Sequence, residues 1–122
     1  MIGYVTLGTN DLPRAAAFYD ALLAEVGGKR FMENEQFIAW SAAQDSAGIG
    51  LTKPFDGQPA TVGNGVMVAL QMPSKEMVDK VYAKAIALGA KCEGPAGPRG
   101  DSFYAGYFRD PDGNKLNAFF MG

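Results

Sequence analysis

An internal repeat is the feature of this sequence that most restricts its fold. A shift of 63 positions carries Tyr4–Leu7 onto Met67–Leu70, and it carries Asp11 onto Ser74. Few residues are identical. The predicted strand, the helix cap, the helix and the glycine that ends it nevertheless occur in the same order in both halves, at matching positions to within one residue. Such self-similarity is typical of a duplicated structural unit. We therefore expect two β-α-β-β-β modules.

The boundaries of these elements follow from hydrophobic periodicity and from residues that favour caps and turns. Strands are predicted over Met1–Gly8, Phe37–Ser41, Ile49–Thr52, Val66–Met72, Phe103–Phe108 and Leu116–Phe120. Helices are predicted to begin after the caps Asp11 and Ser74 and to end at Gly27-Gly28 and Gly89. Pro54–Asn64 is the expected linker and Gly94–Gly100 an expected flexible loop. The modules, about 1–56 and 63–122, would make up one domain, residues 1–122.

The segment Asp110-Pro111-Asp112-Gly113 predicts a tight turn near the end of the chain. Proline suits the second position of a turn, and glycine accepts a positive φ without strain. An aromatic run precedes the turn and an apolar run follows it, so the segment indicates a hairpin. Asn117, four residues beyond Gly113, lies in the returning strand.

The predicted fold class is α+β: two tandem β-α-β-β-β modules that form a curved, mixed-sheet trough with the helices on its outer face. Residues facing away from the helices would line the trough. Because side chains alternate along a strand, parity assigns these lining positions to Tyr4, Thr6, Met67, Ala69, Gln71, Asn117 and Phe119.

Charge and composition exclude several classes of function. Eleven basic and thirteen acidic residues give a net charge of −2 without clustering, so a nucleic-acid partner is not expected. No apolar run approaches the ~20 residues of a membrane span, and no membrane association is expected. The single cysteine, Cys92, allows no internal disulfide and favours a reducing, cytoplasmic setting.

The sequence contains no histidine. Histidine is the usual acid–base group near neutral pH and the commonest metal ligand. Its absence excludes Ser-His-Asp and Cys-His catalysis and every zinc or iron site that needs a histidine. Any metal would have to bind carboxylates and amides alone, so no metal and no cofactor is expected.

The chain resembles the vicinal oxygen chelate superfamily, which includes glyoxalase I, bleomycin- and fosfomycin-resistance proteins and extradiol dioxygenases. The resemblance covers nearly the whole chain. It is carried by the opening strand Met1 to Leu7, by "NDLPRAAAFYDALL", "GNGVMVAL" and "VDKVYAKAIALGAKCEGPAGPRG", and above all by "FYAGYFRDPDGNKLNAFF". It implies a homodimer.

The resemblance also implies where metal-using members carry their ligands: a histidine in the first strand, a histidine in the fifth, and a glutamate in the last strand. These positions correspond to Tyr4, Met67 and Asn117, and a fourth falls near Gly50. A neutral phenol, a soft thioether, an amide and a glycine are not a competent ligand set. The metal chemistry of the family is therefore not carried over.

Three functions stay open at this point. The first is metal-independent binding of an unidentified small molecule in the trough. The residues expected to contact it are Tyr4, Thr6, Met67, Gln71, Arg99, Tyr104, Tyr107, Asn117 and Phe119. The second is a lyase or isomerase of the lactoylglutathione-lyase type that acts without the usual metal. The third is a structural homodimer whose site is vestigial.

Two choices within the candidate site are also open. Arg99 and Arg109 could each clamp an anionic group or could be ordinary surface cations. Tyr104 and Tyr107 are an odd number of residues apart, so they face opposite sides of a strand. Parity does not say which of the two lines the trough.

Overall fold

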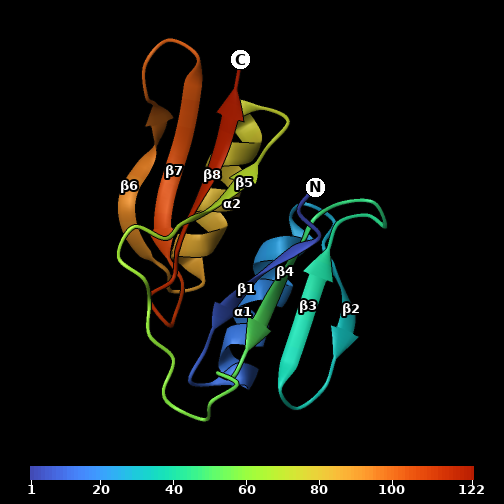
Figure 1. Cartoon of the computed structure of the whole chain (residues 1–122). Helices are drawn as coiled ribbons and strands as arrows, with labels where there is room; N and C mark the ends of the chain where they lie inside the picture. The colour runs from blue at the N-terminus through green and yellow to red at the C-terminus, as the bar shows by residue number, and fades with distance from the viewer. The chain divides into compact units, whose positions relative to one another are not determined.

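A computed structural model describes all residues, 1–122, as two compact units, Met1–Val62 and Gly63–Gly122 (Figure 1). The boundary lies inside the predicted linker. Unit 1 contains β1 (Tyr4–Gly8), α1 (Leu12–Ala24), β2 (Lys29–Glu33), β3 (Phe37–Ser41) and β4 (Gly48–Thr52). Unit 2 contains β5 (Val68–Gln71), α2 (Lys75–Ala87), β6 (Lys91–Pro98), β7 (Phe103–Arg109) and β8 (Lys115–Met121).

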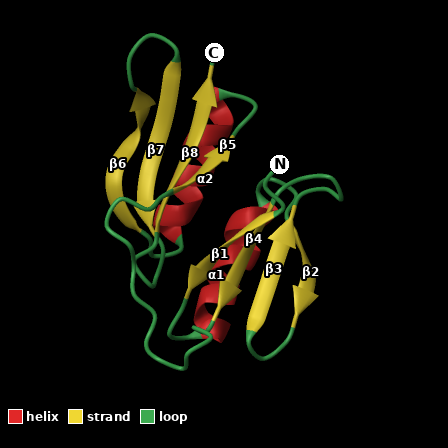
Figure 2. Ribbon diagram, in the orientation of Figure 1, coloured by secondary structure: helices red, strands yellow, loops and turns green.

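Each unit is one four-stranded mixed sheet with a helix on one face (Figure 2). The strand orders are β1-β4-β3-β2 and β5-β8-β7-β6, so the two sheets have the same topology. In each, the first and last strands of the unit are parallel neighbours, and the other pairs are antiparallel. The predicted α+β class and the repeated β-α-β-β-β order are confirmed.

Both helices begin at the predicted caps, and α2 ends just before Gly89 as predicted, whereas α1 ends at Ala24, three residues before Gly27. The carboxylate of Asp11 accepts a hydrogen bond from the backbone N–H of Arg14 at 3.1 Å. The hydroxyl of Ser74 does the same for Met77 at 3.2 Å. Such caps satisfy backbone donors that the first helical turn leaves without partners. Neither helix is long and apolar enough to span a membrane.

The core of each unit lies between its helix and its sheet. In unit 1, α1 contributes Phe18, Tyr19 and Leu22, which are almost fully buried, and the sheet contributes Trp40 and Leu51. The indole N–H of Trp40 finds its partner in Asp20 of α1, at 2.8 Å. In unit 2 the helix residues Val78, Val81 and Ala85 pack toward Phe108, Leu116 and Ala118.

Strand β2 has no counterpart among the predicted strands. All five of its residues, Lys29–Glu33, are exposed, so the segment lacks the alternation that indicates a half-buried strand. Its pairing with β3 also shifts register between Arg30 and Met32. The shift marks an irregularity of the β-bulge kind, which breaks period-two patterning.

The flexible loop predicted over Gly94–Gly100 is wrong for most of its length. Residues up to Pro98 belong to β6, which pairs with β7 through two register shifts. Glycine and proline are depleted in strands, but edge strands and bulges tolerate them. Arg99 supports this irregular edge with hydrogen bonds to the carbonyls of Pro95, Gly97 and Pro98, at 2.7, 3.0 and 3.3 Å.

Candidate functional site

The helix-free face of the unit 2 sheet, here called the unit 2 open face, carries most of the candidate site. In register, Asn117 of β8 lies between Ala69 of β5 and Tyr107 of β7. The neighbouring residue Ala118 pairs with Gly106, where an added Cβ would meet the Tyr82 side chain of α2 at 2.9 Å. Alternation therefore places the helix on one side and these residues on the other: Ala69, Gln71, Phe103, Ala105, Tyr107, Lys115, Asn117 and Phe119.

The choice between the two tyrosines is decided by their partners. The hydroxyl of Tyr104 donates to Asp79 of α2 at 2.7 Å, so this side chain lies on the helix side of the sheet. That hydrogen bond raises the pKa of Tyr104 above its ordinary value, because ionisation would place two anions side by side. Tyr104 therefore does not belong to the open face, and Tyr107 does.

Asn117 is the most unusual residue of this face. It is 2% exposed, and its carbonyl oxygen Oδ1 is buried without a hydrogen-bond partner. Leaving a buried acceptor unsatisfied costs about 1–3 kcal/mol. Functional sites are a common place for such a cost, since a ligand can supply the missing partner.

Aromatic rings and cations surround Asn117 along the strands. The rings of Phe119 and Phe103 stack with centroids 5.4 Å apart and an interplanar angle of 19°. On the other side, Arg99 and Lys115 each lie over the Tyr107 ring, at 5.5 and 5.6 Å from its centroid. Cations at such distances are attracted to the electron-rich face of a tyrosine. Neither Phe103 nor Lys115 was predicted. Parity with Asn117 on β8 could have identified Lys115, but Phe103 lies on β7, whose facing the sequence does not fix.

The two arginines considered as anion clamps are largely occupied within the fold. Both terminal nitrogens of Arg99 donate to carbonyls of β6. Arg109 donates its Nε proton to Glu93 at 2.7 Å and an Nη1 proton to the carbonyl of Gly113 at 3.0 Å. The hydrogen bond from Arg109 holds the pKa of Glu93 below its ordinary value. Lys115 is the remaining basic residue of the face.

Gln71 and Met67 lie at the margin of this face. Gln71 is exposed at the end of β5, and Met67, 39% exposed, stands just before that strand begins. The structure therefore brings Gln71, Tyr107, Asn117 and Phe119 together on one sheet face, with Met67 beside its first strand.

Unit 1 has a corresponding helix-free face, here called the unit 1 open face. Tyr4 and Thr6 of β1 are exposed there and pair in register with Gly48 and Gly50 of β4. The space above the glycines is filled by aromatic rings. A Cβ on Gly50 would lie 2.6 Å from the Phe37 ring, and one on Gly48 would lie 3.1 Å from the Phe31 ring. Tyr4 meets Phe37 edge to face, at 6.0 Å between centroids. Phe31 and Phe37 were not predicted, because nothing in the sequence shows that a ring lies above a glycine.

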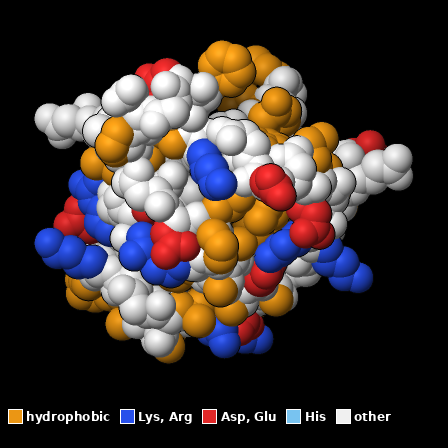
Figure 3. All heavy atoms as spheres, turned by 90° about the horizontal axis from the view of Figure 1, so that it is seen from below, with side chains coloured by type: hydrophobic (Ala, Val, Ile, Leu, Met, Phe, Trp, Pro, Cys, Tyr) orange, Lys and Arg blue, Asp and Glu red, His pale blue; other side chains and the backbone are white.

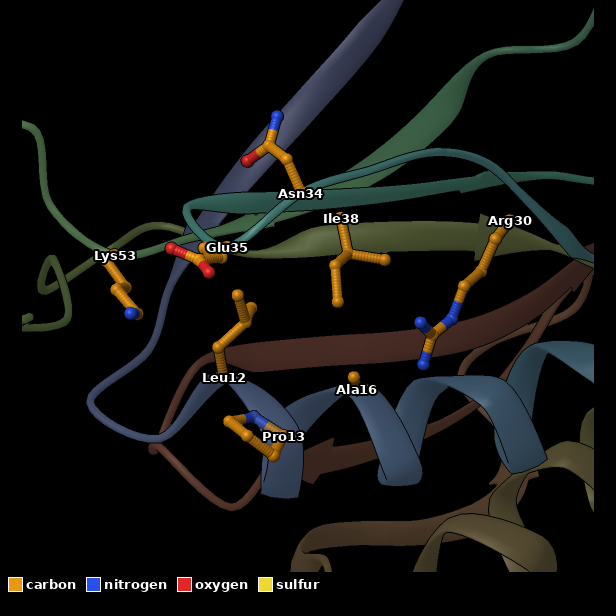
Figure 4. Close-up of a pocket in the computed structure, with 8 residues that line it drawn as sticks. All are labelled: Leu12, Pro13, Ala16, Arg30, Asn34, Glu35, Ile38 and Lys53. Carbon is orange, nitrogen blue, oxygen red and sulfur yellow. The ribbon is translucent and has the colours of Figure 1, made fainter.

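A separate open groove of about 490 Å³ lies on the helix side of unit 1 (Figure 4). Leu12 of α1 and Ile38 of β3 point toward each other across it, with Arg30 at one end and Glu35 and Lys53 at the other. None of the predicted site residues lines it. Arg30 is neutralised by Asp20, at 2.7 Å, and by Glu33, at 2.9 Å. The charge of Arg30 is therefore already balanced within unit 1, and the remaining charged lining residues, Glu35 and Lys53, have opposite signs.

On the face of the molecule shown in Figure 3, basic and acidic side chains lie interspersed among apolar ones. This face carries no broad area of a single charge sign.

Comparison with known proteins identifies the family. The model of the family described as Glyoxalase/Bleomycin resistance protein/Dioxygenase superfamily matches residues 1–118. The chain belongs to this superfamily. A search of curated proteins found no match.

Solved structures of superfamily members have the same fold. A glyoxalase/bleomycin resistance protein from Albidiferax ferrireducens T118 is 38% identical, with a TM-score of 0.90 over 100% of this chain and 99% of that chain. A glyoxalase/bleomycin resistance protein/dioxygenase family enzyme from Burkholderia phytofirmans PsJN is 19% identical, with a TM-score of 0.78 over 98% of each chain. A lactoylglutathione lyase from Agrobacterium tumefaciens is 21% identical, with a TM-score of 0.74 over 98% of this chain and 92% of that chain. At the two lower identities the likeness shows the fold alone.

The residues that the family resemblance matches to metal ligands, Tyr4, Gly50, Met67 and Asn117, do not fit a metal ion. No group of three or more histidine, cysteine, aspartate or glutamate side chains is placed to hold one. At Gly50 the Phe37 ring occupies the space into which a ligand side chain would project. At Asn117 the donor is a neutral amide, and Met67 and Tyr4 offer a thioether and a phenol, which are poor ligands for hard divalent cations.

Proposed function

We propose that this superfamily member binds a small organic molecule on the open faces of its sheets without using a metal ion. The observation that supports this most directly is Asn117, whose buried carbonyl oxygen lacks a hydrogen-bond partner. The family resemblance matches this position to the ligand glutamate of metal-using members. An amide can hold a ligand by a hydrogen bond but is a weak metal ligand.

The surroundings of Asn117 fit a ligand of mixed character. The stacked Phe103 and Phe119 offer apolar surface, and Lys115 with Tyr107 offers a charged and polar border. Ligand sites typically combine an apolar lining with a few convergent polar groups. A cytoplasmic location and a homodimer belong to the same proposal, the first from the single cysteine and the second from the family resemblance.

A thermal-shift screen of small organic molecules in the presence of EDTA tests this function. A ligand at one hundred times its Kd adds about 2.7 kcal/mol of stability. For a chain of this length that corresponds to a rise in Tm on the order of 10 °C. Changes in the NMR chemical shifts of the backbone amides of Gln71, Tyr107 and Phe119 show whether the compound binds at the unit 2 open face. The Asn64→Ala variant, changed in the exposed linker, serves as the control and should respond as the wild type does.

Two results would reject the proposal. One is the absence of any stabilising compound, which favours a structural protein with a vestigial site. The other is stabilisation that appears only when zinc, nickel or iron replaces EDTA. Conversion of a glutathione hemithioacetal in EDTA would instead support the alternative, a lyase or isomerase that acts without the usual metal.

A further inference from the structure

We infer that the ligand of the unit 2 open face is an organic anion that carries an N–H or O–H group, and that this group donates to Oδ1 of Asn117. The inference rests on the proposed function and names the ligand class for the same site. It follows from one unsatisfied acceptor, one cation without a direct salt bridge and one apolar wall, which succeed one another along β8.

The acceptor comes first. Oδ1 of Asn117 is buried and has no hydrogen-bond partner. Its neighbours across the sheet are Ala69, which has no donor in its side chain, and Tyr107. Phe119, the next residue on the same face, also lacks a donor. The backbone N–H groups of β8 form hydrogen bonds with the neighbouring strands β5 and β7, so they are not available to Oδ1. The Tyr107 hydroxyl, the one side-chain donor among these neighbours, does not bond to Oδ1 in the structure. A ligand with a donor of its own can therefore supply the missing partner.

The charge comes next. Lys115 stands two residues before Asn117 on the same face, about 7 Å away along the strand. Its ammonium lies over the Tyr107 ring, and Arg99 lies over the same ring. Glu93, the nearby carboxylate, is bound by Arg109 at 2.7 Å. Lys115 also acts on Glu93 through its charge, but Glu93 makes its direct salt bridge with Arg109. The ammonium of Lys115 is therefore available for a direct contact with a carboxylate or phosphate on the ligand.

The apolar wall lies on the other side of Asn117. Phe119 follows it by two residues and stacks on Phe103 of the neighbouring strand. Along β8 the order is thus cation, acceptor and aromatic pair. A complementary ligand has an anionic end, a donor in its middle and a flat apolar end, so it belongs to the class of N-acyl amino acids and similar amide-bearing acids.

Hippurate, which is N-benzoylglycine, has these three parts in this order. Benzoyloxyacetate replaces its N–H with an oxygen and is otherwise closely matched. The affinities of both compounds are measured by calorimetry in EDTA on the wild type, on Asn117→Leu, on Lys115→Met and on the control Asn64→Ala. Hippurate should bind the wild type roughly tenfold more tightly than its oxygen analogue, because only hippurate satisfies the buried acceptor.

The variants separate the contributions. In Asn117→Leu the two compounds should bind equally. In Lys115→Met both should bind more weakly by the same factor, and their ratio should stay as in the wild type. Asn117→Asp serves as a second variant should the leucine variant fail to fold. Its carboxylate accepts the same hydrogen bond but repels an anion, so it should weaken both compounds and keep hippurate ahead.

Equal affinity of the two compounds for the wild type overturns the inference. Tighter binding of the oxygen analogue, or a ratio that persists in Asn117→Leu, overturns it as well. If neither compound binds while other screened molecules bind at the unit 2 open face, the ligand class is wrong and the proposed function stands. If no molecule binds at all, the proposed function itself fails.

Discussion

Replacing Asn117 with leucine is expected to stabilise the ligand-free protein. The asparagine buries an acceptor that has no partner, and leucine is of similar size but has no polar atom to desolvate. Removing the unsatisfied group recovers about 1–3 kcal/mol, and the different shape of leucine in a packed sheet face costs about 1 kcal/mol. The expected net gain is about 1 kcal/mol, or a rise in Tm of roughly 4 °C.

Asn114 provides the matched control, because it is also a buried asparagine of the same unit. It is 7% exposed, and its side-chain amide donates to the buried carboxylate of Asp110 at 3.0 Å. Asn114→Leu removes that donor from a carboxylate that is 4% exposed. A lost hydrogen bond to a buried charge costs about 1.5–3 kcal/mol, so this variant should be destabilised.

Urea denaturation of the two variants and the wild type, without ligand, provides the measurement. The midpoint should rise for Asn117→Leu and fall for Asn114→Leu at an unchanged m-value. A fall for Asn117→Leu as large as that for Asn114→Leu would show that the folded protein already satisfies the Asn117 amide. The case for Asn117 as a ligand acceptor would then be lost.

Three further outcomes test other parts of the structure. Gly50→Ala should destabilise the fold by about 1–3 kcal/mol, because its Cβ would lie 2.6 Å from the Phe37 ring; Phe37→Leu in the same chain should recover part of the loss, and urea midpoints measure both. A hydrogen bond from Arg30 is the main cause that holds the pKa of Asp20 below its ordinary value. This carboxylate therefore stabilises the folded protein at pH values above its unfolded pKa, and that stabilisation is lost as the pH falls through its folded pKa. Acid unfolding below about pH 4, followed through the fluorescence of Trp40, should therefore show a steeper loss in the wild type than in Asp20→Asn; parallel curves would contradict this. Tyr104→Phe should leave ligand affinity unchanged, since this side chain lies on the helix side of the sheet, and a tenfold loss measured by calorimetry would return it to the site.

Much of the fold was predictable because its signals are local. The caps at Asp11 and Ser74, the apolar stripes of the helices and the tight turn before Lys115 each depend on residues a few positions apart. The repeat then joined these local signals into a topology. Strand β2 lacked such a signal because its side chains are exposed and its register shifts at a bulge.

The candidate site was less predictable, because its decisive features are pairings across strands. Parity placed Asn117 and Phe119 on one face, but only the hydrogen bond from Tyr104 to Asp79 shows which tyrosine joins them. The contact between the Phe37 ring and Gly50 joins two different strands, β3 and β4, so neither segment alone predicts it. The missing partner of the Asn117 carbonyl likewise becomes visible only when its neighbours are known.

Every strand pairing in this protein lies within a single unit, and the first and last strands of each unit are neighbours. A cut in the chain between Val62 and Gly63 would therefore interrupt no sheet. Two copies of the chain could exchange units through that linker without losing one strand-to-strand hydrogen bond. Because each sheet is complete within its own unit, a gene for one unit can be duplicated and fused end to end. One copy can then change in sequence while the other keeps its sheet.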